Sequence, residues 1–206
     1  APNSFSVLAQ QNIKLNQIRF KLHKNLNTND ILVSKIISNP KIFSINLKNK
    51  KNLFIGFRAK SHTDLIDLRK INHYNIDDFW EKIESKNNKI VLDPGAFYIL
   101  SSREYVSVST SYAAEMAPYL PMIGEFRVHY AGFFDPGFGY SSDNTKKSRA
   151  VLEVRCHDTP FILEHGQKMG ELIFEEMLEK PDVLYGKKLK SNYQGQGLKL
   201  SKHFKN

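Results

Sequence analysis

Short alternations of apolar and polar residues recur along most of the chain, and this pattern is typical of β-strands with one buried face. Turn residues, mainly Pro, Gly, Asn and Asp, separate these alternations. Many short strands with few helices predict an all-β sandwich or barrel. The strand-like segments are 42–47, 53–59, 63–68, 89–93, 96–100, 105–109, 125–134, 149–155, 160–164 and 171–177.

Two segments have helical rather than strand periodicity. In 27–38 the apolar residues recur at helical spacing, and Pro40 ends the pattern. In 75–85, Asn75 is a candidate N-cap and the apolar residues form one face of a helix. We therefore expect one or two short helices beside the strands.

The hydrophobic pattern divides the chain into four parts. Residues 1–20 contain a strand, a polar turn and a second strand ending in Phe, and the segment 160–174 repeats this order. Because of this repeat, and because residue 1 is not Met, we expect 1–20 to be the closing hairpin of an upstream module of the same fold. We expect 21–39 to be a helical linker, 40–184 to be the β domain, and 185–206 to be a polar, basic arm that buries little surface and is mobile without a ligand.

The composition narrows the class of partner. With 41% hydrophobic and 25% charged residues, the chain is of ordinary globular type. It has 30 Lys and Arg against 21 Asp and Glu, a formal net charge of +9, and these charges are spread along the chain. This spread favours a phosphorylated small molecule over a nucleic acid. No apolar run is long enough for a transmembrane helix, and a single cysteine favours the cytoplasm. We predict neither a nucleic-acid nor a membrane partner.

Zinc chemistry has little support in the sequence. There is one cysteine, and neither H-x-x-x-H nor H-E-x-x-H occurs. The P-C-x-x-C motif of the zinc-dependent nucleobase deaminases is also absent. Cys156 continues the alternation of apolar residues that precedes it, which favours a small buried thiol over a nucleophile. We expect no zinc.

Glu153 is a carboxylate within the apolar strand pattern 149–155. Ala150, Leu152 and Val154 point to one face of that strand, and Glu153 points to the other. One reading is a solvent-facing Glu that pairs with a neighbouring Lys or Arg. The other is a base held in a half-buried pocket, where burial would raise its pKa. The spacing leaves both readings open.

The segment 129–140 is apolar and aromatic but contains Asp-Pro-Gly, which is turn chemistry. Asp135 can therefore be simply the first residue of a turn. His129, on the strand before it, is more often a packed or rim histidine than a catalyst. A ligand contact through either residue is the alternative reading.

Five motifs in this order resemble the signature of the dCTP deaminase and dUTPase superfamily. The resemblance covers about 40–206 and is greatest to the second module of long, two-module bacterial dCTP deaminases. The motifs are V-L-D-P-G-A-F-Y-I-L (91–100), A-G-F-F-D-P-G-F (131–138), A-V-L-E-V (150–154), P-F-I-L-E-H-G-Q-K-M-G-E-L-I-F (160–174) and Y-x-x-Q (193–196).

The resemblance implies a fold and an activity. The fold is a dUTPase-like β-clip, or distorted jelly-roll barrel, in a homo-oligomer, a trimer whose neighbouring modules share active sites. The activity is zinc-independent hydrolytic deamination of dCTP to dUTP, with Mg²⁺ bound through the triphosphate and no metal held by the protein alone.

The resemblance also implies roles for particular residues. Glu153 matches the catalytic glutamate that activates a water and relays its proton. Asp135 matches an aspartate that holds the deoxyribose, and Ala131 matches a position whose backbone meets the base. The remaining positions that match, or lie beside, substrate-binding residues of the family are His129, Tyr185, Lys190, Tyr193 and Gln196.

The chain departs from the family where a G-R-S-S segment and a later Arg should bind phosphate. Ala117, Pro118 and Met122 stand there, and Pro has no N–H to donate. Asn192 replaces the Lys expected before the tail tyrosine, with Lys190 close by. Three hypotheses follow: a deaminase whose site is completed by another module or subunit, a catalytically silent assembly module, and a dUTPase-like pyrophosphatase.

Overall fold

The computed structural model describes residues 41–48, 54–118, 126–128, 132–140, 148–186, 189, 191–195 and 197–205. The chain divides between Pro40 and Lys41 into two units, and all the described residues belong to the second. The predicted hairpin 1–20 and the predicted linker 21–39, with its helix, lie outside the described residues and stay predictions.

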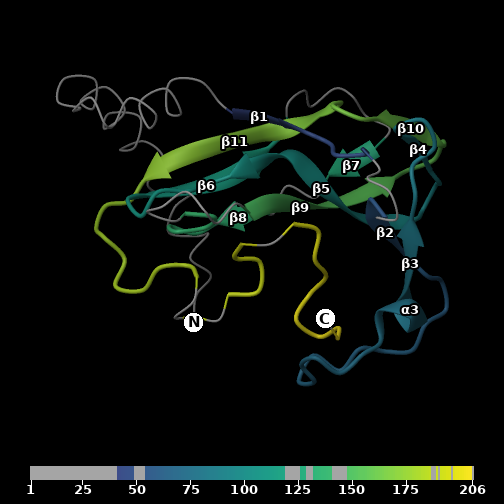
Figure 1. The fold of residues 1–206 in the computed structure, drawn as a ribbon, viewed down its shortest axis with the longest axis horizontal. Coiled ribbons are helices and arrows are strands. Elements are labelled where there is room, and N and C mark those ends of the chain that lie inside the picture. Colours follow the sequence, from purple (N-terminus) through teal and green to yellow (C-terminus); the bar gives the residue numbers. More distant parts are fainter. Residues whose placement is uncertain are drawn as a thin grey trace. The chain divides into compact units, whose positions relative to one another are not determined.

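The described strands form three antiparallel sheets (Figure 1). One sheet has the order β1 (Lys41–Ser44), β11 (Lys168–Glu176), β6 (Tyr112–Ala117), β8 (Phe133–Phe134). The second has the order β3 (Trp80–Ile83), β2 (Gly56–Ala59), β5 (Phe97–Val106), β9 (Ser148–Cys156), β7 (Phe126–Val128). The third pairs β10 (Phe161–Glu164) with β4 (Lys89–Leu92). The all-β prediction is confirmed, and among the described strands the sheets stay open.

Strand β9 shows the predicted alternation of buried and outward-facing residues. Ala150, Leu152 and Val154 are each 0% exposed, and Cys156 at the end of the strand is buried as predicted. Strand β5 pairs with β9 over most of its length, and these two strands form the centre of the five-stranded sheet. The opposite face of β9 carries Glu153, which is exposed. The strand therefore fixes the direction of the candidate catalytic side chain.

The helix predicted over 75–85 is wrong in its second half. Helix α3 covers only Ile76–Phe79, and the chain then continues directly as β3. Strand β3 pairs with β2 over four residues, so its backbone groups are satisfied by a sheet partner. Asn75 stands at the N-cap position but makes no side-chain cap hydrogen bond. Tertiary pairing has overridden the local helical pattern.

The strand predicted over 63–68 is also wrong. Leu65 is 94% and Leu68 is 71% exposed, so the alternation does not bury an apolar face. Asp67 instead accepts hydrogen bonds from the backbone N–H and the guanidinium of Arg69. These hydrogen bonds hold the pKa of the Asp67 carboxyl below its usual value. A local turn has replaced the strand, because Asp side chains compete for backbone donors.

The C-terminal segment is better packed than the sequence suggested. We expected the arm 185–206 to bury little, but Leu200 and Phe204 are 6% and 4% exposed. They belong to a cluster with Phe57, Phe79 and Ile99. The expectation of an unpacked arm is therefore wrong for 197–205, because its two large apolar residues complete a core cluster. The boundary between domain and arm stays a prediction.

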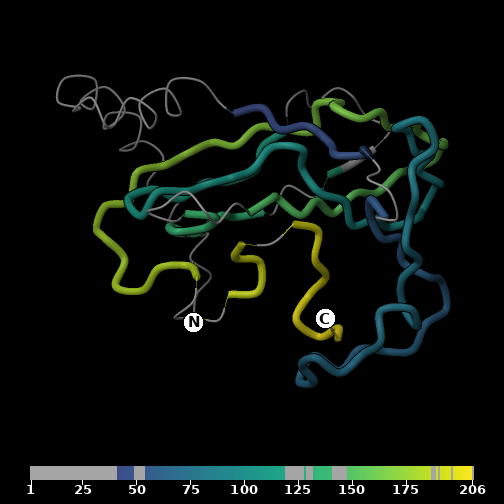
Figure 2. The backbone as a smooth tube through the Cα atoms, in the orientation of Figure 1, coloured from purple at the N-terminus to yellow at the C-terminus, as the bar shows by residue number. Residues whose placement is uncertain are grey.

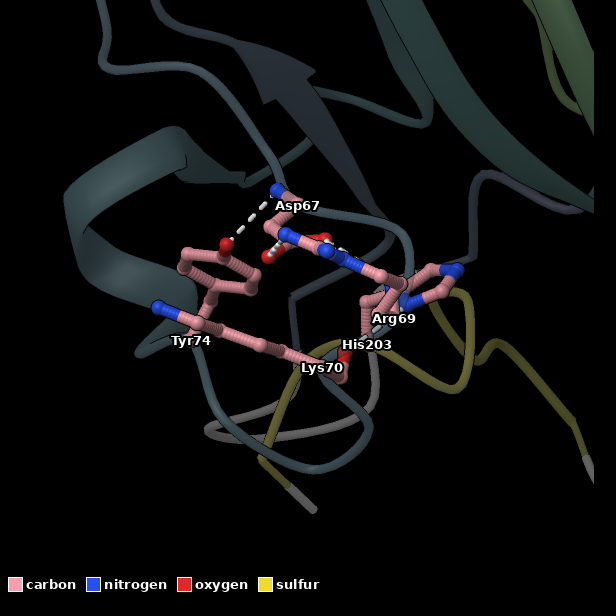
Figure 3. A network of polar contacts seen from close by, with 5 residues as sticks. All are labelled: Asp67, Arg69, Lys70, Tyr74 and His203. Carbon is pink, nitrogen blue, oxygen red and sulfur yellow. Dashed lines mark hydrogen bonds and ion pairs between the residues drawn. The ribbon is translucent and has the colours of Figure 1, made fainter.

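Backbone hydrogen bonds hold the C-terminal segment against the loop that precedes α3 (Figure 2). The N–H of Asn72 donates to the carbonyl of Lys202 at 2.9 Å, and the N–H of Lys205 donates to that of Tyr74 at 2.8 Å. Figure 3 shows the polar side of this junction, where His203 Nδ1 lies 2.9 Å from the carbonyl oxygen of Lys70. The loop and the last residues thus form one structural element.

Candidate functional site

The Asp-Pro-Gly segment forms the predicted turn. The carbonyl of Asp135 accepts a hydrogen bond of 3.0 Å from the N–H of Phe138, which closes a four-residue turn. Gly137 has a φ of +96°, a conformation that L-residues with a side chain rarely adopt. A Cβ at Gly137 would also lie 2.9 Å from the carbonyl oxygen of Tyr185. The glycine is therefore required both by the turn and by the chain that packs on it.

The Asp135 carboxylate stands at the edge of this turn. Its side chain reaches solvent, yet the surrounding atoms desolvate it enough to raise its pKa. Tyr185 lies against the same turn: its N–H donates to the carbonyl of Pro136 at 2.9 Å, and its ring lies 5.4 Å from that of Phe138. Tyr185 is thus packed against the turn that carries Asp135.

Glu153 faces a cavity of about 470 Å³ between the two larger sheets and the C-terminal segment. We call this the Glu153 cavity. Its walls are mostly aromatic and aliphatic, with a few polar groups among them, as in many small-molecule sites. It is lined by Trp80, Phe97, Ile99, Met116, Gly132, Phe133, Phe134, Phe138, Arg149, Val151, Glu153, Tyr185, Tyr193, Lys199, Leu200, Ser201 and Phe204.

Residues 193–195 join the turn to the cavity. The N–H of Tyr193 donates to the hydroxyl of Tyr185 at 3.2 Å. Burial raises the pKa of Tyr193, and the negative charge of nearby Glu153 raises it further. Gln194 Oε1 accepts from the N–H of Gly139 at 2.9 Å. The tail therefore places a tyrosine next to the candidate catalytic carboxylate.

The structure brings together part of the predicted site. Glu153, Tyr185 and Tyr193 line one cavity, and Asp135 stands on the adjoining turn. The other predicted residues, His129, Ala131, Lys190 and Gln196, lie outside the described residues. Their roles, like those of the residues that line the cavity, stay predictions.

Sequence reasoning missed several residues of the cavity. Trp80 lies in the segment 75–85, for which a helix is predicted, but its indole lines the cavity. Its buried Nε1 has no hydrogen-bond partner among the described residues. Arg149 shares the face of β9 that carries Glu153, a relationship that the period of the strand could have revealed. In the tail, the family spacing Y-x-x-Q points to Gln196 and not to Gln194, and no other sequence pattern marks Gln194.

The segment that lacks the family's phosphate-binding residues borders the cavity at one end. Met116 lines the cavity, and Ala117 pairs with Glu171 as the last residue of β6. Pro118 follows β6, and Met122 lies outside the described residues. Neither Ala117 nor Pro118 has a side chain able to donate a hydrogen bond to a phosphate.

Two further properties concern metals and membranes. Within the described ranges, no three His, Cys, Asp or Glu side chains are grouped so that they could hold a metal ion. No helix in the described part of the chain has the length and apolar character needed to cross a bilayer.

Comparison with known proteins agrees with the motifs. Residues 17–204 match the model of the 2′-deoxycytidine 5′-triphosphate deaminase (DCD) C-terminal domain. A relative from Methanococcus maripaludis (strain C7) called "dCTP deaminase, dUMP-forming" is 28% identical over 157 residues, which are 73% of this chain and 72% of the relative. One from Bifidobacterium longum (strain DJO10A) with the same name is 34% identical over 110 residues, 52% of this chain and 53% of the relative.

A solved structure is also similar. The crystal structure of 2′-deoxycytidine 5′-triphosphate deaminase from Agrobacterium tumefaciens shares 49% sequence identity with this chain at a TM-score of 0.65. The match covers 76% of this chain but only 50% of the Agrobacterium chain. The predicted dUTPase-like fold is thereby confirmed.

The fold and the matched motifs define a member of the dCTP deaminase and dUTPase superfamily. The chain belongs to the dCTP deaminase family, and what it matches there is the C-terminal domain. It spans about half the length of the Agrobacterium protein and of the Bifidobacterium relative.

Proposed function

We propose that the chain forms part of a dCTP deaminase and that Glu153 is its catalytic acid and base. The observation that carries the proposal is the position of Glu153, an acid on the outward face of an otherwise apolar strand, at the wall of a largely apolar cavity. The shared name of the relatives favours this function over the hypothesis of a silent assembly module.

In the proposed reaction, water adds to C4 of the cytosine ring while the Glu153 carboxylate accepts a proton from that water. The proton moves through Glu153 to the substrate, so that the amino group leaves as ammonia and the carbonyl of uracil forms. A positioned acid and base of this kind contributes about 10²–10⁴-fold to a rate. The flat aromatic walls of the cavity suit a pyrimidine ring, which stacks on aromatic side chains.

Asp135 and the tail have binding roles in this proposal. Asp135 stands on the turn that Tyr185 and Gln194 contact. In this proposal its carboxylate accepts a hydrogen bond from the sugar of the nucleotide. Tyr185 and Tyr193 would cover the nucleotide from the tail side and exclude bulk water. Exclusion of water strengthens the hydrogen bonds inside a site.

Magnesium enters this proposal as part of the substrate. Mg²⁺ prefers oxygen ligands and commonly binds through the phosphates of a nucleotide, so the triphosphate itself would hold it. We further propose a trimeric arrangement in which a neighbouring module or subunit completes the site. The absence of Arg and Ser at 117 and 118 supports this sharing.

The product is a separate question. Deamination converts dCTP and water into dUTP and ammonia, and a second hydrolysis would convert dUTP and water into dUMP and pyrophosphate. The relatives from Methanococcus and Bifidobacterium are named as dUMP-forming, which favours the second step as an additional activity.

The test is to incubate the purified protein with dCTP and Mg²⁺, to separate the nucleotides by anion-exchange chromatography, and to measure ammonia enzymatically. We expect ammonia and uracil nucleotides in equal amounts, with pyrophosphate equal to any dUMP. Thymidine triphosphate, which has no exocyclic amine, is the control and should release no ammonia. Ammonia release that does not exceed this control, from a protein that binds dCTP, would reject the proposed function.

A further inference from the structure

A second cavity, of about 460 Å³, shares Arg149 with the Glu153 cavity as a lining residue. Three cationic side chains and one histidine line it, namely Lys48, Arg103, Arg149 and His165. We call it the cationic cavity. Its other walls come from β5, from the residues that follow β1, from the residues that precede β2, and from the tail at Gly197.

Arg149 is held in a fixed position between the two cavities. Its Nη1 donates hydrogen bonds of 2.6 Å to the carbonyls of Ser102 and Arg103. Its guanidinium carbon lies 4.4 Å from the centre of the Tyr105 ring, a cation–π geometry. Both backbone hydrogen bonds use one nitrogen of the guanidinium. The stacked, planar group is therefore pre-organised to offer its remaining donors to an anion.

Arg103, on β5, and His165, on the turn after β10, both line the cationic cavity. The Nη1 of Arg103 lies 3.5 Å from the place that a Cβ on Gly166 would occupy, so its guanidinium lies over the turn that carries His165. His165 Nδ1 accepts a hydrogen bond of 3.1 Å from the N–H of Leu47. The imidazole proton is therefore on Nε2, which leaves that nitrogen as a donor.

No Asp or Glu is among the described residues that line the cationic cavity. Burial lowers the pKa of the His165 imidazole, and the charges of Arg103 and Lys48, which line the same cavity, lower it further. Glu104 is the nearby acid, but its two carboxylate oxygens accept hydrogen bonds from the N–H and the hydroxyl of Ser44. Among the described residues, the ion pairs are made by other cations, Arg58, Arg69, Lys82 and Lys89.

We propose that the cationic cavity is a phosphate-binding site. Two guanidinium groups and a lysine supply charged hydrogen-bond donors, and the neutral imidazole of His165 supplies one further N–H. Charged donors bind the oxygens of a phosphate more strongly than the oxygens of a neutral ligand. The chain lacks the Arg and Ser of the family's phosphate segment at 117 and 118. The cations of the cationic cavity come from other parts of the fold.

The position of Arg149 indicates which phosphates could bind. Arg149 and Glu153 are four residues apart on one face of β9, a separation of about 13 Å along an extended strand. The phosphates of a nucleotide with its base at Glu153 reach the cationic cavity if the phosphate chain runs along β9 towards Arg149. This assignment to the nucleotide rests on the proposed function, whereas phosphate binding itself does not.

Calorimetric titration of the protein with sodium tripolyphosphate, at near-physiological salt and without Mg²⁺, tests the phosphate site. We expect saturable binding that R103Q weakens by about tenfold or more, the usual effect of losing a charged hydrogen-bond donor. R69Q is the matched control, because it removes the same charge from an exposed loop. Arg69 is not among the residues that line the cationic cavity. R103K should bind with intermediate affinity. Circular dichroism should show that each variant is folded.

A second titration, with dCTP added to the E153Q protein, distinguishes the two sources of phosphate. Competition between dCTP and tripolyphosphate, with both weakened by R103Q, identifies the phosphate chain of the nucleotide as the ligand. Independent binding of the two, with only tripolyphosphate weakened, identifies a separate phosphate ligand. Equal effects of R103Q and R69Q, or no saturable binding, would overturn the site. A failure of deamination leaves these binding results unaffected.

Discussion

Gln194 is joined to Gly139 by a hydrogen bond of 2.9 Å between the backbone N–H of the glycine and the side-chain Oε1 of the glutamine. The Nε2 of the same side chain donates to the carbonyl of Gly137 at 3.2 Å. One amide thus satisfies a donor and an acceptor of the loop that begins with Asp135. This side chain couples the position of the tail to the position of the turn.

Replacement of Gln194 by Ala should loosen the tail without unfolding the sheets. Each lost hydrogen bond of this type contributes about 0.5–1.5 kcal/mol. Hydrogen exchange followed by mass spectrometry should show faster exchange at Gly139 and over 191–195 in Q194A. Q167A is the matched control, because Gln167 makes a local hydrogen bond to the N–H of Glu164. Unchanged exchange at Gly139 in Q194A would contradict the coupling.

Replacement of Glu153 by Gln should remove turnover and keep nucleotide binding. The amide retains the shape of the side chain but cannot accept the proton of the attacking water, so we expect a loss of about 10²–10⁴-fold in kcat. Glu179→Gln, which changes an exposed acid outside the cavity, serves as the control. The affinity for dCTP, measured by calorimetry, should change little. A normal rate of ammonia release by E153Q would exclude Glu153 as the acid and base.

Asp135 should make stability depend on pH in a defined direction. Burial raises its pKa, so the folded state is penalised at pH values above that raised pKa, where the carboxylate is charged. The penalty decreases as the pH falls through the folded pKa and is absent below the unfolded value of about 3.9. D135N removes the charge and keeps a residue that turns favour.

The measurement for Asp135 is urea unfolding of the wild type and D135N at neutral pH and at about pH 3.5. D135N should be the more stable protein at neutral pH, and the difference should largely disappear at the acidic pH. Asp158→Asn, at an exposed turn, is the control and should show no comparable change between the two pH values. A D135N protein that is less stable at neutral pH would show that the carboxylate has a stabilising partner.

Phe204 should contribute to stability although it lies near the end of the described chain. It is 4% exposed, and its ring lies 5.7 Å from that of Phe79. Truncation of a buried Phe to Ala typically costs about 3–5 kcal/mol, and we expect the lower end because the tail can undock locally. Leu178→Ala, at a residue that is 73% exposed, is the control. Equal urea midpoints for F204A and the wild type would show that the cluster is not formed in solution.

Trp80 provides a direct optical test of the Glu153 cavity. It is the one tryptophan in the sequence, and its indole lines the cavity. A nucleotide that enters the cavity should change the intensity or the wavelength of its emission, because both depend on the polarity and the stacking of the indole environment. Titration of E153Q with dCTP, followed by fluorescence, should give the same affinity as calorimetry. Constant emission at dCTP concentrations that saturate by calorimetry would exclude binding next to Trp80.

The sequence allowed the strands to be predicted where burial follows a strict period of two. In β9, five buried residues alternate with four that are intermediate or exposed. The Asp-Pro-Gly turn was predictable for a similar reason, since Gly137 adopts a positive φ that few other residues tolerate. The strand alternation and the turn both depend on residues that are close in the sequence, so the sequence alone is enough to predict them.

The failures concern segments whose structure depends on distant partners. Residues 80–83 have a helical pattern, but pairing with β2 turns them into a strand. Leu200 and Phe204 looked like isolated apolar residues in a polar arm, because the aromatic cluster that receives them is drawn from residues much earlier in the chain. Within the candidate site, Glu153 was found by its strand pattern and its family motif, whereas Trp80 and Gln194 were not marked by either.

The junction between the tail and the loop before α3 has a consequence for how the protein is made. Tyr74 forms a β-bridge with Phe204, so an aromatic cluster begun early in translation receives its last ring only when residue 204 has left the ribosome. Until then Phe57 and Phe79 lack that partner, and closing so long a loop adds entropic cost to the final step. Premature termination before residue 200 would leave the sheet intact in outline but expose aromatic surface, which is what quality-control proteases and chaperones recognise.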